Sequence, residues 1–431
     1  MDMCSLSHPD PALLDQLLAP ARFILKNYSR STRPCPVISD EDFVRRGFLR
    51  TLSQAKSGRD FLQHQAEVFN EPLARASFFD SLHSIRRRDL LLELNSQFYL
   101  QPRPNAPEDL LAPFPELADR AVWAVDGHKI KHTCHALRDP KGRHVAPNTL
   151  YLLCLHSGLS FNLAAVQGHG RYRHEMPVFR AAWPKFLRRQ PARPNPATAP
   201  LVVADPAFID HAFWDQQRTL RQAGALMITR AKENLAPRAQ KARPFDQNDP
   251  VNLGVDSDRR VTFDGGHVMR LIEYTDPETG TCYQFLTTDL TLRPGVVAWL
   301  YLLRWRIEKV FDTAKNKLEE TKGWATGPVA QEIQAHFLAL THNLLVLFRS
   351  KLDRDFDLRE EKILRKGERR LTQRVDRARS NKMEVHPMHF KMPRIVQLSL
   401  QYIRTLRNHV FAQHRLSHAL PHLHASLRTY L

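Results

Sequence analysis

The sequence of 431 residues lacks most of the features that membrane and secreted proteins need. No uninterrupted apolar run approaches the roughly 18 residues that span a bilayer, so no membrane partner is expected. The N-terminal stretch MDMCSLSHPDPALL has neither the basic nor the apolar region of a secretory signal peptide. The five cysteines form no Cys-x-x-Cys pair, which indicates reduced thiols in a cytosol-like compartment. We therefore expect a cytoplasmic protein.

Internal repeats, low-complexity tracts and familiar zinc motifs are missing as well. The stretch GHGRYRHEM contains His169 and His174 but has no His-Glu-x-x-His spacing and no cysteine partner. We do not expect zinc there.

Apolar content and positive charge are what the sequence does have. An apolar fraction of 42% can bury a sizeable core, and about 150 residues per domain suggests two to four domains. The 63 Lys and Arg exceed the 45 Asp and Glu by 18. Such an excess predicts a polyanionic partner, and nucleic acid is favoured because no amphipathic membrane anchor is evident.

Residues 1–112 are predicted to be helical, with leucines at helical spacing over 10–28 and further helices over 41–55 and 59–98. A break near Asn70 gives a helix-break-helix pattern. It fits a helix-turn-helix that enters a DNA groove, and it fits equally a bundle that packs on its neighbour. The proline-rich stretch 101–117 is the expected linker.

Residues 113–230 are expected to form an α/β unit with a mixed sheet. Apolar β-prone runs alternate there with helical patterns: strands over 120–130, 149–158, 159–168, 199–208 and 225–234, and helices over 174–189 and 211–224. Residues 231–290 lose helical periodicity and carry turn sequences, which predicts antiparallel β structure.

Helices return over 293–320 and 329–352, so 291–350 is expected to complete the α/β unit. Residues 351–431 hold 18 Lys and Arg against 8 Asp and Glu. On a helix, Arg370, Arg374 and Arg377 would share one face, suited to a DNA backbone or simply solvated. Apolar stripes further on predict two more helices.

Two aspartates follow apolar strands, where an open α/β sheet usually builds its site. Asp126 ends one strand and Asp205 another. Together with a third carboxylate they would make an oxygen-rich cage for Mg²⁺. Capping of a turn is the alternative role for each.

Glu308 is the candidate third carboxylate. Tyr301 precedes it by seven positions, Arg304 by four, and Lys315 follows by seven, so all four side chains share one face of a helix. One carboxylate among two cations and a phenol suits a metal flanked by phosphates. The alternative is an ordinary Glu308–Arg304 pair on a solvated face. Trp299 and Trp305, beside these residues, are expected to anchor the core.

The spacing Tyr301-x2-Arg304-x3-Glu308-x6-Lys315 resembles the Tyr-Arg-Glu-Lys signature of bacterial insertion-sequence transposases of the DDE superfamily, in the group typified by insertion sequence four. WAVDGHKI and VVADPAFID resemble the segments around that family's two aspartates, and the resemblance covers about 120–345. Two departures are Ala207, where the family usually has glycine, and the lack of tryptophan in 231–290. Phe245, Phe263 or Tyr283 would have to replace that tryptophan.

The resemblance implies an RNase H-like catalytic core interrupted by a β-rich insertion, with helical N-terminal and C-terminal domains. Asp126, Asp205 and Glu308 would bind two Mg²⁺ ions, for which Mn²⁺ can substitute. Phosphates of the DNA end would be held by these further residues: Tyr301, Arg304, Lys315, Arg230 and Lys232.

The family's activity implies a cut-and-paste DNA transposase that acts on the double-stranded inverted repeats of its element and on target DNA. It would work in the bacterial cytoplasm, on the nucleoid, as a homodimer paired through its C-terminus. The expected units are 1–112, a DNA-end-binding domain; 113–230 and 291–350, the two parts of the core; 231–290, the insertion; and 351–431, for DNA contact or dimerisation.

Two rival functions remain open. A metal-dependent nuclease on the same core would cut without joining. A non-catalytic DNA-binding protein derived from a transposase would do neither, and Ala207 keeps this possibility open although all three carboxylates are present.

Overall fold

The computed structural model describes most of the chain. The described residues are 10–28, 37–100, 109, 111–112, 114–130, 137–138, 141–142, 144–145, 148–166, 174–189, 199–220, 224–233, 235–276, 280–318, 320, 322–356, 373, 376, 380 and 398–428. The predicted arginine face of Arg370, Arg374 and Arg377 lies outside them. None of the helices described here is long and apolar enough to cross a membrane.

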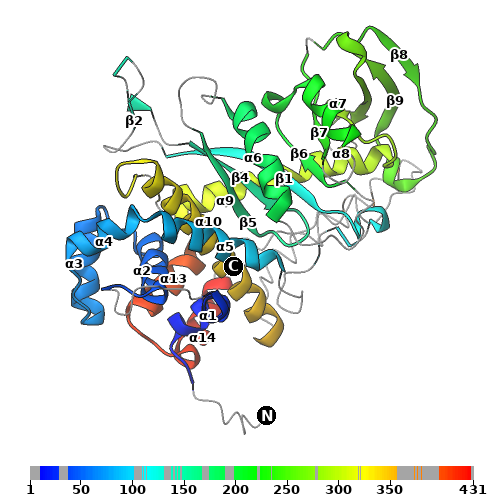
Figure 1. The fold of residues 1–431 in the computed structure, drawn as a ribbon. Coiled ribbons are helices and arrows are strands. Elements are labelled where there is room, and N and C mark those ends of the chain that lie inside the picture. Colours follow the sequence, from blue (N-terminus) through cyan, green and yellow to red (C-terminus); the bar gives the residue numbers. More distant parts are fainter. Residues whose placement is uncertain are drawn as a thin grey trace.

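A nine-stranded mixed sheet forms the centre of the α/β part, in the order β5-β4-β1-β6-β7-β11-β10-β9-β8 (Figure 1). Its first strands lie antiparallel, and two parallel strands follow on the other side of β1. The bounds are β1 Val122–Lys129, β4 Asn148–Cys154, β5 Ser160–Val166, β6 Leu201–Val203 and β7 Leu226–Arg230. This confirms the predicted α/β class with a mixed sheet.

The segment predicted as antiparallel β is antiparallel β, and it continues the same sheet. It supplies β8 Ala239–Ala242, β9 Val255–Thr262, β10 Val268–Thr275 and β11 Cys282–Thr287. β11 pairs with β7, for example Thr287 opposite Ile228. A short hairpin not predicted from the sequence, β2 Leu137–Arg138 with β3 His144–Val145, stands apart from the large sheet.

Helices cover both faces of the sheet, because the two faces of β1 are both apolar. Val122 and Ala124 face a core shared with α8 Pro294–Leu303 and α9 Trp305–Asp312. Trp123 and Val125 face the opposite core, which contains α6 Glu175–Arg189 and α7 His211–Thr219. The alternation of side chains along a strand therefore decides which helix each residue of β1 meets.

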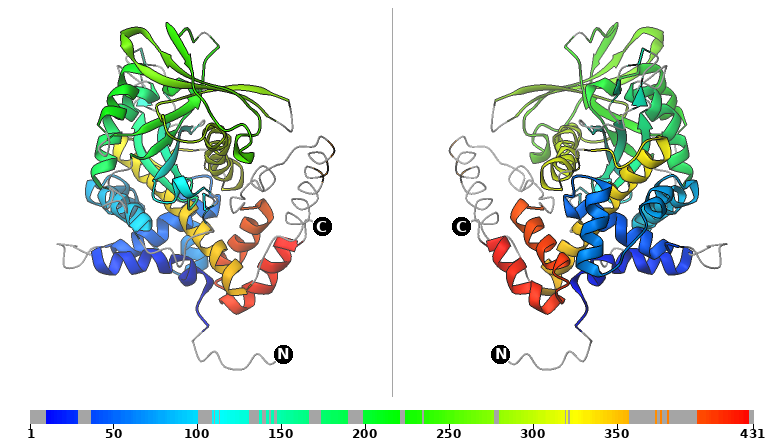
Figure 2. Two further views of the ribbon diagram at one scale, coloured as in Figure 1. Left: turned by 90° about the vertical axis from the view of Figure 1, so that its right-hand side faces the viewer. Right: turned by 90° about the vertical axis from the view of Figure 1, so that its left-hand side faces the viewer.

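Helices from both ends of the chain share a third core. They are α1 Leu13–Tyr28, α2 Asp40–Ser53, α3 Gly58–Phe69, α4 Arg75–Leu82, α5 Ile85–Leu100, α10 Pro328–Phe356, α13 Leu400–Phe411 and α14 Leu416–Arg428. Figure 2 shows the blue and red helices gathered at one end of the molecule, away from the green strands. The boundary expected at residue 350 falls inside α10.

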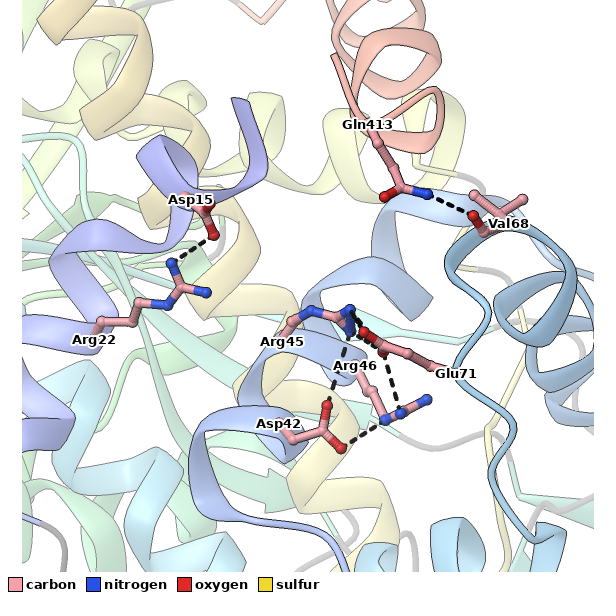
Figure 3. Close-up of polar contacts among 8 residues, drawn as sticks. All are labelled: Asp15, Arg22, Asp42, Arg45, Arg46, Val68, Glu71 and Gln413. Carbon is pink, nitrogen blue, oxygen red and sulfur yellow. Dashed lines mark hydrogen bonds and ion pairs between the residues drawn. The ribbon is translucent and has the colours of Figure 1, made fainter. Parts of the chain in front are cut away.

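Charged side chains fasten these helices to one another (Figure 3). Arg45 of α2 donates to both oxygens of Glu71, and Arg46 donates to Asp42 at 2.8 Å. Gln413, in the turn between α13 and α14, donates to the carbonyl of Val68 in α3 at 2.6 Å. The end of the chain is thereby tied to its beginning.

The helix-break-helix segment is held by contacts of the same kind. Arg86 pairs with Asp40 at 2.6 Å, Arg87 donates to the Ile38 carbonyl at 2.6 Å, and Arg88 lies 3.4 Å from Glu332. Arg86 and Arg88 thus bind α2 and α10, and Arg87 binds the segment just before α2, so all three take part in packing within this structure.

The helix predicted over 293–320 is interrupted. α8 ends at Leu303, Arg304 forms a tighter turn in which the Ile307 amide donates to its carbonyl, and α9 follows. The last part, Thr313–Lys317, is a π-helix, η8, a widened form that is frequent at functional sites. The spacing of apolar residues in the sequence does not show where an α-helix tightens or widens.

Candidate active site

Asp126 lies in the fifth position of β1 and points to the face that α9 covers, two residues beyond Ala124. Its Oδ1 accepts a hydrogen bond from the Gly127 amide at 2.8 Å. Burial raises the pKa of Asp126 to about 6, although Gly127 and Arg304 oppose the rise; the negative charges of Asp205 and Glu175 add to it. The nearby positive charge and hydrogen bonding therefore do not offset the burial of the Asp126 carboxylate.

Asp205 lies beside Asp126 because β6 runs parallel to β1. The register pairs Ala124 with Val203, so each aspartate follows two residues after the last paired position. Asp205 also caps the short helix η4, Pro206–Phe208, by accepting from the Ala207 amide at 2.7 Å. The capping role foreseen as an alternative is real and coexists with proximity to Asp126.

Glu308 lies in the first turn of α9. Arg304 connects it to β1, because one guanidinium nitrogen lies 3.2 Å from Asp126 Oδ2 and another 3.2 Å from Glu308 Oε1. The Glu308–Arg304 pair considered as the alternative is therefore present, with its arginine 7% exposed and its glutamate side chain 42% exposed. Two of the three predicted carboxylates are therefore brought together through one buried cation.

Tyr301 and Lys315, the other two signature residues, surround this pair. Tyr301 is buried in α8, packs on Phe285 with ring centroids 5.1 Å apart, and accepts a hydrogen bond from Arg304. Burial raises the pKa of Tyr301, so the phenol stays protonated. Lys315, half-buried in η8, lies close enough to His128 of β1 to lower the histidine's pKa.

His128 is a site residue whose role the sequence left undefined. It is 2% exposed and stacks on Phe311 of α9 with ring centroids 4.8 Å apart. Burial, with Lys315, lowers its pKa to about 4, so the imidazole is neutral near pH 7. Within the described structure neither ring nitrogen has a hydrogen-bond partner.

Glu175 is a fourth acid that the sequence did not predict. It begins α6 on the opposite face of β1, where a Cβ added at Gly127 would lie 2.0 Å from its Oε1. Asn148 donates to the same oxygen at 3.1 Å. In the sequence Glu175 is only an acid at the start of a predicted helix. Acids are common at helix starts in all proteins, so this feature does not indicate a functional site. Gly127 is what allows Glu175 to approach the strand.

Arg230 and Lys232, the further predicted cations, line a cavity of about 840 Å³ next to Asp205. Pro206 forms part of its wall, and Tyr283 of the insertion lines it as well. Acids line it too, among them Glu233, Asp256 and Glu273. Of the three aromatic candidates in the insertion, Phe263 is buried against His211, whereas Tyr283 borders this cavity.

The two tryptophans near the signature behave differently. Trp299 is buried and packs edge-on against Phe114 at 4.5 Å between ring centroids, as expected of a core anchor. Trp305 is 59% exposed, so its expected core role is wrong.

The donor set fits divalent cations. Asp126, Asp205 and Glu308 offer hard carboxylate oxygens of the kind that Mg²⁺ and Mn²⁺ prefer. The raised pKa of Asp126 reflects a buried carboxylate that a nearby cation would stabilise in its charged form. Arg304 supplies part of that charge in this structure.

Two carboxylates at the ends of adjacent strands and a third on a covering helix form an acidic site of the kind that divalent cations suit. The family model described as transposase DDE domain matches residues 118–344. This is more than half of the 431 residues, and the chain belongs to the DDE transposase family. The family implies cleavage of nucleic acid, DNA as the partner and divalent metal ions. A search among curated proteins found no match.

Proposed function

We propose that the chain is a cut-and-paste transposase of the group typified by insertion sequence four, which binds the inverted repeats of its element and both cleaves and joins strands. The observation that carries the proposal is Arg304, whose guanidinium pairs with Asp126 and Glu308 at 3.2 Å each. This contact links β1, which carries Asp126, to α9, which carries the glutamate of the signature. The strand order around β1 supports an RNase H-like core.

Asp126, Asp205 and Glu308 would hold two Mg²⁺ or Mn²⁺ ions. When bound, such a pair activates a water or 3′-hydroxyl and stabilises the leaving oxygen of an in-line displacement. The protein orients these acids through the Gly127 amide, the Ala207 amide and Arg304.

We assign contact with the DNA phosphates to the cations around the carboxylates. Arg304 would exchange a carboxylate for phosphate oxygens, and the buried Tyr301 orients its guanidinium. Lys315 adds a point charge from η8. Arg230 and Lys232 would hold the backbone further along, in the cavity beside Asp205. These phosphate contacts would position the DNA on the protein and would contribute little to recognition of the base sequence.

The helical parts would complete the complex. We assign end binding to residues 1–112 and DNA contact or homodimer pairing to residues 351–431, whose net charge supports contact with a polyanion. Strand cleavage in trans within a dimer would follow.

Cleavage and joining of a repeat-end duplex test the proposal. The substrate is a labelled duplex that carries the imperfect inverted repeat flanking the coding region, with Mg²⁺ and a second duplex as target. Nicking at the repeat boundary and joining should occur with the unchanged protein and be lost in Asp126→Asn and Glu308→Gln. Asp264→Asn, which changes an exposed acid of the insertion region, is the control and should retain both activities.

The rival functions give other results. Nicking without joining would identify a nuclease. Binding without cleavage in Mg²⁺ and in Mn²⁺ would identify a DNA-binding protein and rule out the three-carboxylate site.

A further inference from the structure

Four histidines gather where α13 meets α14, far along the chain from the carboxylates. His409 lies in the last turn of α13, His414 follows in the connecting turn, and His418 and His422 occupy successive turns of α14. The spacing of four between the last two puts both on one face of that helix. The family match at 118–344 ends before this segment, and none of the proposed metal-binding or phosphate-binding residues lies in it.

The nitrogens of this cluster are close enough to share an ion. Nδ1 of His409 lies 2.8 Å from Nδ1 of His414, and one ring nitrogen from each of His409, His414 and His418 lies within 4.8 Å of the others. Zinc–nitrogen bonds of about 2.0–2.1 Å in a tetrahedron separate neighbouring nitrogens by about 3.3 Å. Small side-chain rotations would therefore bring these three nitrogens to the spacing of zinc ligands.

His422 can complete the set. Its ring centroid is 4.9 Å from that of His409 and 5.7 Å from that of His418. His414 and His418 are 4.2 Å apart by the same measure. Four imidazoles thus lie in one cluster, and three of them already have nitrogens within 4.8 Å of one another; His409 is buried and His418 exposed, so an ion would have a route from solvent.

The backbone around the cluster is fixed by the beginning of the chain. The Leu13 amide donates to the His414 carbonyl at 3.0 Å, and the Leu416 amide donates to the Pro11 carbonyl at 3.0 Å. Gln413 holds the same turn to Val68 of α3 (Figure 3). The ligands are therefore presented by a positioned turn between two packed helices, which lowers the ordering cost of binding.

The chemistry of the donors selects the ion. Imidazole suits Zn²⁺, Cu²⁺, Co²⁺ and Ni²⁺, whereas Mg²⁺ prefers oxygen. The nearby Asp10 accepts from the Ser417 amide at 3.2 Å and so belongs to the turn's own hydrogen bonding.

We propose that His409, His414, His418 and His422 bind one Zn²⁺ ion, which clips α13 to α14 and to the N-terminal segment 10–13. The site is separate from the DNA-processing centre and does not depend on the proposed transposase activity. It is a structural site, because all four coordination positions come from the protein.

Zinc binding is tested on the full-length protein purified without a histidine tag. The protein is stripped with chelator and dialysed against Zn²⁺ in excess Mg²⁺, and bound metal is measured by mass spectrometry. One Zn²⁺ per chain is expected. The variants His409→Gln and His414→Gln should weaken binding at least about tenfold, because losing a ligand costs more than losing an outer partner. Co²⁺ should give the intense visible bands of tetrahedral coordination, and Zn²⁺ should raise the Tm.

Two controls locate the ion. His424→Gln, on the same helix but outside the cluster, should bind as the unchanged protein does. Asp126→Asn should also retain the ion, which excludes the carboxylates. Circular dichroism of each variant confirms that it is folded. No zinc in the unchanged protein, or equal binding in His409→Gln and His424→Gln, would overturn the proposal.

Discussion

Asp126 is a partly buried carboxylate of the candidate site, and its ionisation is linked to stability. Burial raises its pKa from 3.8 to about 6. The folded state then binds the proton more tightly than the unfolded state. This contribution to stability is complete below about pH 4 and is lost as the pH rises through about 6.

Asp126→Asn removes this titration. In chelator, the unfolding free energy of the variant minus that of the unchanged protein should rise by about 1–3 kcal/mol between about pH 4 and about pH 8, since one pKa unit is worth about 1.4 kcal/mol. Urea denaturation across this range measures the difference. Mg²⁺ should shrink it by stabilising the ionised carboxylate of the unchanged protein. A difference that stays flat with pH would contradict the burial of this carboxylate.

Trp305 is a second residue whose surroundings suggest a role. It follows Arg304 directly and is 59% exposed, which is unusual for a tryptophan beside a buried ion pair. An exposed indole next to cations that we propose to bind phosphate suits the stacking of an unpaired base.

Trp305→Ala should weaken binding of a repeat-end duplex with a frayed or nicked terminus by about 1–3 kcal/mol and leave the Tm nearly unchanged. Fluorescence anisotropy and thermal denaturation measure the two effects. Trp299→Ala is the matched control: it empties a core position, and we expect a loss of about 3–5 kcal/mol in stability. Equal DNA affinity of Trp305→Ala and the unchanged protein would exclude stacking.

At the scale of elements, the loop before α8 helps to position α8 and α9. Asp289 is fully buried there and lies 2.9 Å from Arg120, which precedes β1. Burial alone would raise the pKa of Asp289, but Arg120 and the amides of Leu292 and Thr291 bring it below its ordinary value. The start of α8 is thereby tied to the start of β1, and α9 follows from there.

Asp289→Ala should lower the unfolding free energy by about 3–5 kcal/mol, because it leaves the guanidinium of Arg120 buried without its charge partner. The matched control is Asp264→Ala, which breaks an exposed pair with Arg238 and should cost less than about 1 kcal/mol. Urea denaturation compares them. Similar losses in the two variants would show that burial of the first pair is unimportant.

The elements themselves were largely predictable, and their winding and surroundings were not. Apolar β-prone runs and helical periods predicted the strands and helices around Asp126 and Asp205, because a strand that is buried on both faces is a continuous apolar run in the sequence. The turn at Arg304 was missed, since apolar spacing continues across it. Glu175 was missed because only the tertiary fold brings α6 against Gly127.

At the scale of the whole molecule, the two chain ends complete a single helical core. Ala12 and Arg415 form an isolated β-bridge, and Leu406 of α13 belongs to the same core as Leu17 of α1. Sequence periodicity predicted each helix but not this union, because contacts between residues hundreds of positions apart leave no local pattern.

Leu406→Ala should therefore reduce amide hydrogen-exchange protection in α1 as well as in α13, with a loss of about 2–5 kcal/mol in the stability of the helical part. Gln401→Ala, at an exposed position of α13, is the control and should change neither. Loss of protection confined to α13 would mean that the terminal helices are independent units.

The shared core also imposes an order in time on the synthesis of the protein. At about 5–20 residues per second, a ribosome needs about 20–80 s to travel from α1 to α13. During that interval the apolar faces of α1 and α10 have no C-terminal partner to cover them. We expect the sheet to fold first and the nascent helices to wait, exposed to chaperones and proteases, until the last part of the chain emerges.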